Sequence, residues 1–149
     1  MTLFQFEADF VDSLRCIPMV VRYKLDTCGV KLKLEHWNSF SDEEKQLLVD
    51  KLCEPGAEAI AYRDYLQQLV TEHTGSPAKE LSIDPHPMWM DAAHIPEQVQ
   101  EKATDCHLVI TSDQWAALTP LQRFALIKLS RPSHENRNFL PAFQEFQHP

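Results

Sequence analysis

Residues 17–50 read IPMVVRYKLDTCGVKLKLEHWNSFSDEEKQLLVD, and residues 95–128 read IPEQVQEKATDCHLVITSDQWAALTPLQRFALIK. When the second segment is placed against the first at a shift of 78 residues, without a gap, seven of the 34 positions are identical. The identical pairs are Ile17 and Ile95, Pro18 and Pro96, Val21 and Val99, Lys24 and Lys102, Cys28 and Cys106, Trp37 and Trp115, and Leu48 and Leu126. A fixed internal period predicts two copies of one structural unit. Features shared by the copies are expected to be scaffold, so features of one copy alone are the better functional candidates.

In each copy a helix is expected to begin at the Ile-Pro pair, because proline is tolerated in the first turn of a helix. The first of these helices should end at Gly29, since glycine suits the left-handed conformation of a C-cap. The second copy has His107 at that place. Histidine tolerates a positive φ poorly, so this helix is expected to end differently. The runs that follow, residues 30–34 and 108–110, are typical of short extended segments.

Two capping boxes mark the next helix in each copy. Ser41 with Glu44, and Thr119 with Gln122, place a hydroxyl three residues before a Glu or Gln, a pair that satisfies free N–H groups at a helix start. Together with a third segment of helical apolar spacing, they predict helices at about 42–53, 120–130 and 57–73.

Two further helices have weaker signals. The N-terminal stretch FEADFVDSL has apolar residues four apart. Near the C-terminus Phe139, Phe143 and Phe146 keep helical spacing, although Pro141 interrupts it. Both segments are interpreted as helical.

These patterns predict a mainly α fold made of two helical units related by a pseudo-two-fold axis, from the internal repeat of residues 17–50 and 95–128. At most a small two-stranded β pairing is expected, joining 30–34 to 108–110 across that axis. A chain of 149 residues suits a single domain, 1–149. Its expected parts are a repeat unit at about 10–75, an extended connector at 76–94 pinned by Trp89, and a second repeat unit at about 95–149.

Composition and charge exclude several function classes. The formal net charge is −8, which argues against general nucleic-acid binding. Basic residues gather at 13–34 and 121–149, and a two-fold arrangement could bring these stretches to one face. No apolar stretch reaches the length of a membrane span, and the acidic N-terminus lacks the basic region of a secretory signal. Scattered cysteines without a CxxC pair indicate a reducing cytoplasm.

The four cysteines are candidate metal ligands with an alternative interpretation. Cys28 and Cys106 occupy equivalent places in the repeat, so a two-fold axis could bring them together. Metal sites usually show local ligand spacing such as CxxC, which is absent here. We therefore interpret both residues, and likewise Cys16 and Cys53, as buried core thiols.

His86 and His94 flank Trp89, and Asp84 and Asp91 are near enough in sequence to orient them. A small metal- or cofactor-handling enzyme that uses these histidines and the cysteines is the alternative function. The proline-rich connector gives no rigid platform, however, so structural or surface histidines are favoured. The sequence contains no HExxH motif, Gly-rich phosphate loop or nucleophile elbow, and we predict no catalytic residue, metal or cofactor.

The stretch SRPSHENRNFLP at 130–141 is polar and has no good match in the first copy. Loops held by a scaffold often carry binding, and arginine makes bidentate contacts with carboxylates or phosphates. A solvated C-terminal loop is an equal alternative. The candidate partner-binding residues are Arg15, Arg22, Lys24, Arg131, His134, Asn136, Arg137 and Asn138.

Three runs of sequence carry a resemblance that covers almost the whole chain. FEADFVDSLRCIPMVVRYKLDTCGVKLKL at 6–34, DPHPMW at 84–89 and LTPLQRFALIKLSRPSHENRNFLP at 118–141 resemble the cyanobacterial nitrate-reductase-associated protein family. The resemblance implies a soluble, cytoplasmic, non-catalytic accessory protein that supports maturation or activity of an assimilatory molybdenum nitrate reductase. Such a reductase uses a molybdopterin cofactor, an iron–sulfur cluster and reduced ferredoxin. The expected partner is therefore nitrate reductase, with ferredoxin or the molybdopterin cofactor as further candidates, and without nucleic acid or membrane.

Overall fold

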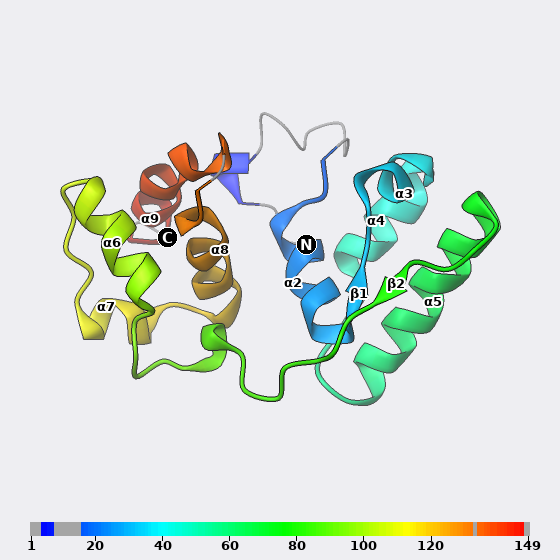
Figure 1. Cartoon of the computed structure of the whole chain (residues 1–149), viewed down its shortest axis with the longest axis horizontal. Coiled ribbons are helices and arrows are strands. Elements are labelled where there is room, and N and C mark those ends of the chain that lie inside the picture. Colours follow the sequence, from blue (N-terminus) through cyan, green and yellow to red (C-terminus); the bar gives the residue numbers. More distant parts are fainter. Residues whose placement is uncertain (1–3, 8–15, 133, 148–149) are drawn as a thin grey trace. The chain divides into compact units, whose positions relative to one another are not determined.

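The structure is a computed structural model that describes residues 4–7, 16–132 and 134–147. It is mainly helical, as predicted, and the chain divides into two compact units, Met1–Asp84 and Pro85–Pro149 (Figure 1). The elements of the first unit are the 3₁₀-helix η1 (Gln5–Glu7), α2 (Met19–Cys28), β1 (Val30–Lys31), α3 (Leu34–Ser39), α4 (Asp42–Asp50), α5 (Ala57–Thr74) and β2 (Lys79–Glu80). Those of the second unit are the 3₁₀-helix η2 (Met88–Met90), α6 (Glu97–Asp105), α7 (Ser112–Ala117), α8 (Pro120–Ser130), the 3₁₀-helix η3 (His134–Asn138) and α9 (Phe139–Gln147).

The core of the first unit lies between its helices. The helix α2 packs against α4 and α5, and α3 packs against α5. Apolar side chains at helical spacing form the buried faces, such as Val21 and Leu25 on α2 and Leu66 and Val70 on α5. Trp37 of α3 is fully buried in the same unit. Burial of these faces is the main source of stability for helices of this length.

Local signals explain where α4 and α8 begin. Ser41 Oγ accepts a hydrogen bond from the N–H of Glu44 at 3.1 Å, and the Glu44 carboxylate accepts the N–H of Ser41 at 2.8 Å. Thr119 and Gln122 make the same two bonds at 3.1 and 2.9 Å. Each box satisfies two N–H groups at the helix start, so the predicted capping boxes are confirmed.

The start of α2 is capped from outside the helix. Pro18, which precedes α2, makes no side-chain capping bond. The buried carboxylate of Glu7 in η1 instead accepts the N–H of Met19 at 3.0 Å, where the helix dipole favours a negative charge. The rest of the helix predicted in the N-terminal stretch, residues 8–15, lies outside the described residues.

The small sheet pairs β1 with β2, antiparallel, with Val30 opposite Glu80. The predicted pairing of residues 30–34 with 108–110 is therefore wrong. Residues 108–110 form no strand, and the first extended run is short because α3 already begins at Leu34. The partner strand comes instead from the segment that follows α5.

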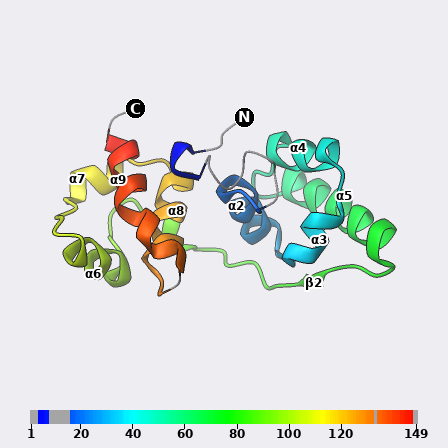
Figure 2. The same ribbon diagram turned by 90° about the horizontal axis from the view of Figure 1, so that it is seen from above.

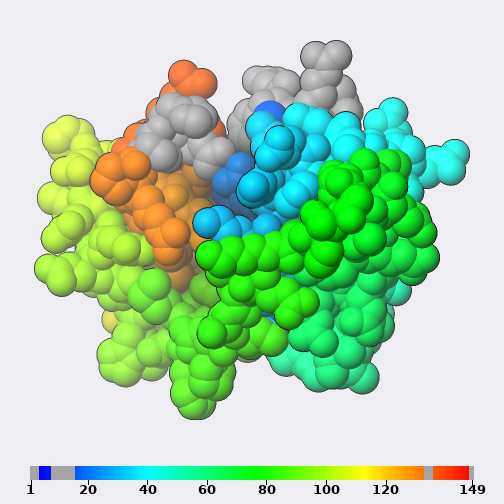
Figure 3. Space-filling view, turned by 45° about the vertical axis from the view of Figure 1, so that its right-hand side comes forward, coloured from blue at the N-terminus to red at the C-terminus, as the bar shows by residue number. Residues whose placement is uncertain are grey.

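Side-chain and backbone bonds hold this following segment against the first unit. The amide of Gln67 on α5 makes two 2.8 Å hydrogen bonds with the backbone of Ala78. The N–H of Leu81 donates to the carbonyl of Gly29 at 2.8 Å. A Cβ at Gly29 would lie 2.6 Å from the Leu81 carbonyl oxygen, so this close approach requires glycine. The segment, in bright green, lies on the surface of the unit (Figure 3).

In the second unit α8 is the central helix, in contact with α6, α9, η2 and η3 (Figure 2). Seven of its 11 residues are buried, which is typical of a helix surrounded on most sides. Trp89 of η2 meets Phe124 of α8 edge-on, with ring centroids 5.0 Å apart. Trp89 therefore anchors its segment on α8. In the C-terminal α9, Pro141 is accommodated because it falls in the first turn.

Elements of the two units recur at the shift of 78 residues. The starts of α3 and α7 are separated by this interval, and so are the starts of α4 and α8. Trp37 and Trp115, which are equivalent in the repeat, are both fully buried. The local elements therefore correspond along the chain, while a two-fold axis between the units stays a prediction.

The end of α6 differs from expectation. His107 has a φ of 61°, at the place where Gly29 has 78°. The two helices therefore turn at equivalent left-handed residues, although the second one is not glycine. The N–H of Leu108 donates to the carbonyl of Ala103 at 2.8 Å, the bond typical of a Schellman turn. This bond offsets strain that costs about 1 kcal/mol at a non-glycine residue.

Candidate functional site

Lys24, one of the predicted partner-binding residues, directs its charge into the first unit. Its Nζ donates to the carbonyls of Val49 and Lys51, each at 2.6 Å, at the end of α4. The ammonium also lies 5.8 Å from the centre of the Tyr62 ring. Burial lowers the pKa of Lys24 from its usual value, and the charges of Cys53 and Asp50 oppose this shift. Because the ammonium caps α4, we leave Lys24 out of the proposed docking surface.

The other two candidates from the first basic stretch differ in what the structure shows. Arg15 lies outside the described residues. Arg22 is half-buried on α2, and its Nε donates to the carbonyl of Ile17 at 3.1 Å. The guanidinium of Arg22 is therefore oriented by the turn that precedes its own helix.

The second group of candidates follows α8. Arg131 and Arg137 are exposed, whereas Asn136 and Asn138 are half-buried. The backbone of His134 belongs to η3, and its side chain lies outside the described residues. Both α8 and α9 contact η3. We call Arg131, Asn136, Arg137 and Asn138 the η3 surface, because two helices hold its backbone while its two arginines face solvent.

The structure keeps the two groups of candidates in separate units, with Arg22 and Lys24 in the first and the η3 surface in the second. Each group is therefore treated as a surface of its own unit. The η3 surface is the more open of the two, since both of its arginines are exposed, whereas Arg22 and Lys24 are half-buried.

The histidines considered as ligands lie on the surface. His86 is exposed, and His94 Nδ1 lies 3.0 Å from Asp91 Oδ2 with 83% of the His94 side chain exposed. The pKa of Asp91 is lowered. The main cause is the hydrogen bond from the N–H of Ala93, and the second is the hydrogen bond with His94. Within 4–7, 16–132 and 134–147, no group of three or more His, Cys, Asp or Glu is placed to hold a metal ion. The alternative of a metal-handling enzyme thus gains no convergent ligand set from the described residues.

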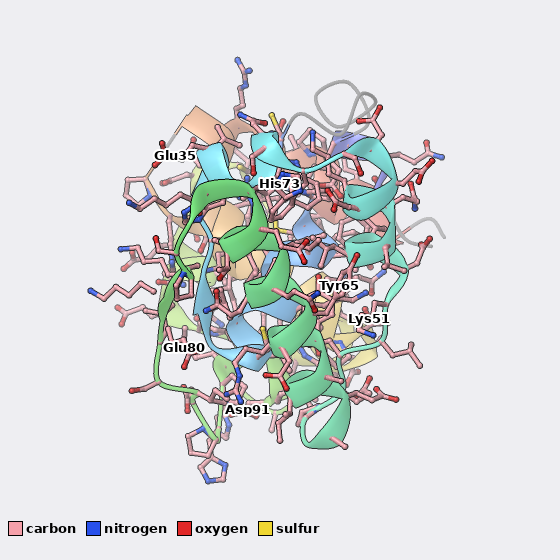
Figure 4. The ribbon with its side chains drawn as sticks, turned by 90° about the vertical axis from the view of Figure 1, so that its right-hand side faces the viewer. Glu35, Lys51, Tyr65, His73, Glu80 and Asp91 are labelled. Atoms are coloured by element: carbon pink, nitrogen blue, oxygen red, sulfur yellow. The ribbon has the colours of Figure 1, made fainter. Side chains whose placement is uncertain are left out.

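The outward side of α5 carries two polar contacts with neighbouring segments. The ammonium of Lys51 lies 5.7 Å from the centre of the Tyr65 ring, and His73 Nε2 lies 2.9 Å from Glu44 Oε1 (Figure 4). The pKa of Glu44 is lowered, mainly by the hydrogen bond from the Ser41 N–H and to a smaller extent by His73. These contacts join the two ends of α4 to α5, so we interpret them as structural.

Cys28 and Cys53 are buried thiols, as predicted, but sequence reasoning missed that both contact the same turn of α2. Cys28 closes α2, and Cys53 lies between α4 and α5; both are buried. Their sulfurs face adjacent carbonyls of one helical turn, at 3.6 Å from Lys24 O for Cys53 and 3.8 Å from Leu25 O for Cys28. Cys106 and Cys16 are only partly buried, so the prediction that they are buried core thiols is wrong.

The two thiols differ in acidity. The neighbouring Cys53 side chain is the largest cause that lowers the pKa of Cys28; burial opposes this shift, and backbone bonds and the charge of Arg63 assist it. The Cys28 side chain and burial raise the pKa of Cys53.

A hollow of about 240 Å³ opens beside Cys28. Its walls are mostly apolar and include Ala59 and Ile60 of α5 and Ile83 of the segment after β2, while Arg63 supplies a positive charge. Nothing in the sequence spacing indicates this hollow, because its walls come from three separate segments.

No helix among the described residues combines the length and apolar character needed to cross a membrane. The model of a family described as conserved nitrate reductase-associated protein matches residues 3–146. A search of curated proteins and a search of solved structures each found no match.

Proposed function

Because the chain belongs to the family of conserved nitrate reductase-associated proteins, we propose that it binds nitrate reductase as a non-catalytic, cytoplasmic accessory protein and supports the maturation or activity of that enzyme. The observation that carries the proposal is the extent of the family match, residues 3–146, which is nearly the whole chain. The reductase proposed is the assimilatory, molybdenum-dependent type that takes electrons from ferredoxin.

The η3 surface is the docking site that the charges favour. Arg131 and Arg137 are exposed, and the backbone of η3, which carries Arg137, is held by α8 and α9. Guanidinium groups form bidentate bonds with carboxylates, and a held backbone lowers the entropy lost on binding. We therefore assign an acidic surface of the reductase as the partner of the η3 surface. Arg22, which is half-buried, and Arg15, which lies outside the described residues, are secondary candidates for docking.

Attraction between charges mainly steers encounter and sets specificity. This fits a chain whose net charge is −8, since one local basic surface on an acidic protein selects both a partner and an orientation. Ferredoxin and the phosphate of the molybdopterin cofactor are the other anionic candidates for the same surface.

The support given to the enzyme is tested on the enzyme itself. Nitrate reductase is purified from cells that contain this protein and from cells that lack it, and both molybdenum content and ferredoxin-dependent activity per mole are measured. We expect lower activity without the protein. Reduced molybdenum content would assign the role to maturation, whereas normal content with activity restored by adding the purified chain would assign it to activity. Equal activity and equal molybdenum content would contradict the proposal.

A further inference from the structure

The hollow beside Cys28 has the composition of a small-molecule binding site. It reaches from solvent to the core, because Ile60 and Ile83, each 52% exposed, line it together with the buried Cys28 and Ala59. Exposed apolar side chains that gather beside a concave surface often mark a site of binding. Ligand sites are mainly apolar and contain a few polar groups that orient the ligand.

Arg63 is the charged residue among those that line the hollow. It lies on α5, three residues after Ile60 and four after Ala59, so the three share one face of the helix. Arg63 Nε lies 3.9 Å from Oδ1 of Asp64, whose side chain is 72% exposed. An ion pair of this length between solvated groups contributes little. The guanidinium therefore keeps donors with which to bind an anion.

The ends of two helices also line the hollow, and their dipoles act with opposite sign. Thr27 and Cys28 belong to the last turn of α2, whose carbonyl groups disfavour an anion. Gly56 and Ala59 belong to the start of α5, whose N–H groups favour one, and Gly56 has no side chain that caps them. Because these two contributions oppose each other, Arg63 decides the sign of the charge that the hollow attracts.

The volume of the hollow sets the size of its ligand. A hollow of about 240 Å³ has room for about eight non-hydrogen atoms, at roughly 30 Å³ for each water-sized group. A short carbon chain that ends in one acidic group has this size. Such a molecule matches both features of the site, the apolar walls and the single guanidinium.

We propose that the hollow between α2, α5 and the segment after β2 binds a small organic anion. The apolar body of the anion lies against Ala59, Ile60 and Ile83, and its carboxylate binds the Arg63 guanidinium. The walls supply affinity through burial of carbon atoms, and Arg63 supplies the selection for negative charge. The site belongs to the first unit and the η3 surface to the second, so this inference does not depend on the docking proposed above.

The first test titrates the isotope-labelled full chain with four related probes and follows amide chemical shifts by NMR. Hexanoate combines a carbon chain with a carboxylate. Hexanol has the same chain without charge, hexylamine has the opposite charge, and acetate has the carboxylate with almost no chain. We expect saturable shifts at Gly56, Ala59 and Ile60 with hexanoate, an affinity about tenfold weaker for hexanol, and no saturation with hexylamine or acetate.

Three results of this titration would overturn the proposal. Hexanoate that causes no saturable shift around the hollow would show that no site exists there. Hexanol that binds as tightly as hexanoate would show recognition of carbon alone, without selection for an anion. Hexylamine that binds as tightly as hexanoate would show that Arg63 does not set the sign of the charge.

The second test removes the charge of Arg63. Arg63→Gln should lower the affinity for hexanoate to that for hexanol and leave the affinity for hexanol unchanged. Arg131→Gln is the matched control, since Arg131 is exposed in the second unit and the net charge changes equally. An equal loss of hexanoate affinity in the two variants, or no loss in Arg63→Gln, would contradict the role given to Arg63.

The third test fills the hollow. Ile60→Trp should weaken hexanoate and hexanol alike by about tenfold or more, because the larger side chain occupies part of the space that the ligand needs. Leu47→Trp is the matched control, since Leu47 is 45% exposed on α4 and does not line the hollow. Circular dichroism checks that both variants keep the fold. Equal hexanoate affinities in the two variants would place the ligand elsewhere and contradict the proposed site.

Discussion

The Nε atom of Arg123 lies 2.7 Å from the carbonyl oxygen of Trp89, so a buried guanidinium on α8 holds the segment that carries η2. Its Nη1 also donates to the carbonyls of Leu118 and Trp115, at 2.6 and 3.3 Å. Lys45, the equivalent residue in the first repeat, is likewise buried, and its ammonium lies 5.7 Å from the Trp37 ring. A buried cation beside the buried tryptophan is thus common to both units and is a feature of the scaffold.

Replacing Arg123 by leucine should destabilise the second unit by about 3 kcal/mol, because three carbonyls lose a charged hydrogen-bond donor. Urea unfolding followed by circular dichroism measures the loss. Arg131→Leu is the matched control, since Arg131 is exposed and its loss should change the free energy of unfolding by about 0.5 kcal/mol or less. Equal destabilisation by the two changes would show that the hydrogen bonds of Arg123 add no more stability than an exposed arginine does.

Tyr62 should make the protein sensitive to alkaline pH. Its hydroxyl donates to the carbonyl of Leu48 at 2.8 Å, and burial raises the pKa of Tyr62 well above 10.0. The folded chain therefore holds this proton more tightly than the unfolded chain does. The stabilisation is complete below pH 10 and is lost as pH rises above it, by at most about 1.4 kcal/mol per pH unit. Urea unfolding at several alkaline pH values measures this slope, which should be smaller in Tyr62→Phe.

The control for Tyr62 is Tyr65→Phe on the same helix. The pKa of Tyr65 is raised as well, mainly by burial, but Tyr65 is only partly buried, so its replacement should change the alkaline slope less. Lys24 contributes with the opposite sign, because its pKa is lowered, and that contribution is common to all three proteins. If Tyr62→Phe kept the full alkaline loss of stability, another group would have to be its source.

The equivalent positions 29 and 107 should respond to substitution in opposite ways. Gly29→Ala should destabilise the first unit by about 2 kcal/mol or more, because a Cβ would meet the Leu81 carbonyl oxygen in a left-handed residue. His107→Gly should stabilise the second unit by up to about 1 kcal/mol, because it relieves the strain of a φ of 61°. Thermal unfolding of both variants provides the comparison. A loss of stability in His107→Gly would mean that the imidazole makes a contribution larger than the strain.

Much of the helical structure could be predicted from the sequence because its signals are local. The range predicted for α8, 120–130, matches the structure, and α5 differs from its predicted range by one residue. Hydroxyl and carboxamide side chains within one turn are sufficient to start α8, wherever the rest of the chain lies. Apolar residues at helical spacing over a long segment predict α5 equally well, because every turn of the helix repeats the same pattern.

The features that the sequence failed to predict all depend on contacts between distant segments. The partner of β1 is set by Gln67, which holds the chain after α5, and a short strand carries no signal for its partner. Lysine is typical of the protein surface, yet Lys24 caps α4, a helix that ends 26 residues later in the chain. The approach of Cys53 Sγ to the Lys24 carbonyl, next to the Leu25 carbonyl that Cys28 contacts, was hidden because the repeat suggested Cys106 as the counterpart of Cys28.

Charge reversal on the η3 surface should weaken binding to nitrate reductase. With Arg131→Glu and Arg137→Glu together, we expect affinity to fall about tenfold or more and to depend less on salt, because attraction to acidic groups becomes repulsion. Lys33→Glu with Lys79→Glu is the matched control, as both lysines are exposed in the first unit and the net charge changes equally. Equal weakening in the two double variants would assign the effect to total charge and not to the η3 surface.

The central claim, that this chain binds nitrate reductase, is tested most directly by titrating the purified chain into purified reductase in a calorimeter. The cofactor-free and cofactor-loaded forms of the enzyme are compared, each with and without ferredoxin. We predict saturable binding to at least one form, with a defined stoichiometry. The absence of binding to every form, with ferredoxin present or absent, would contradict the account.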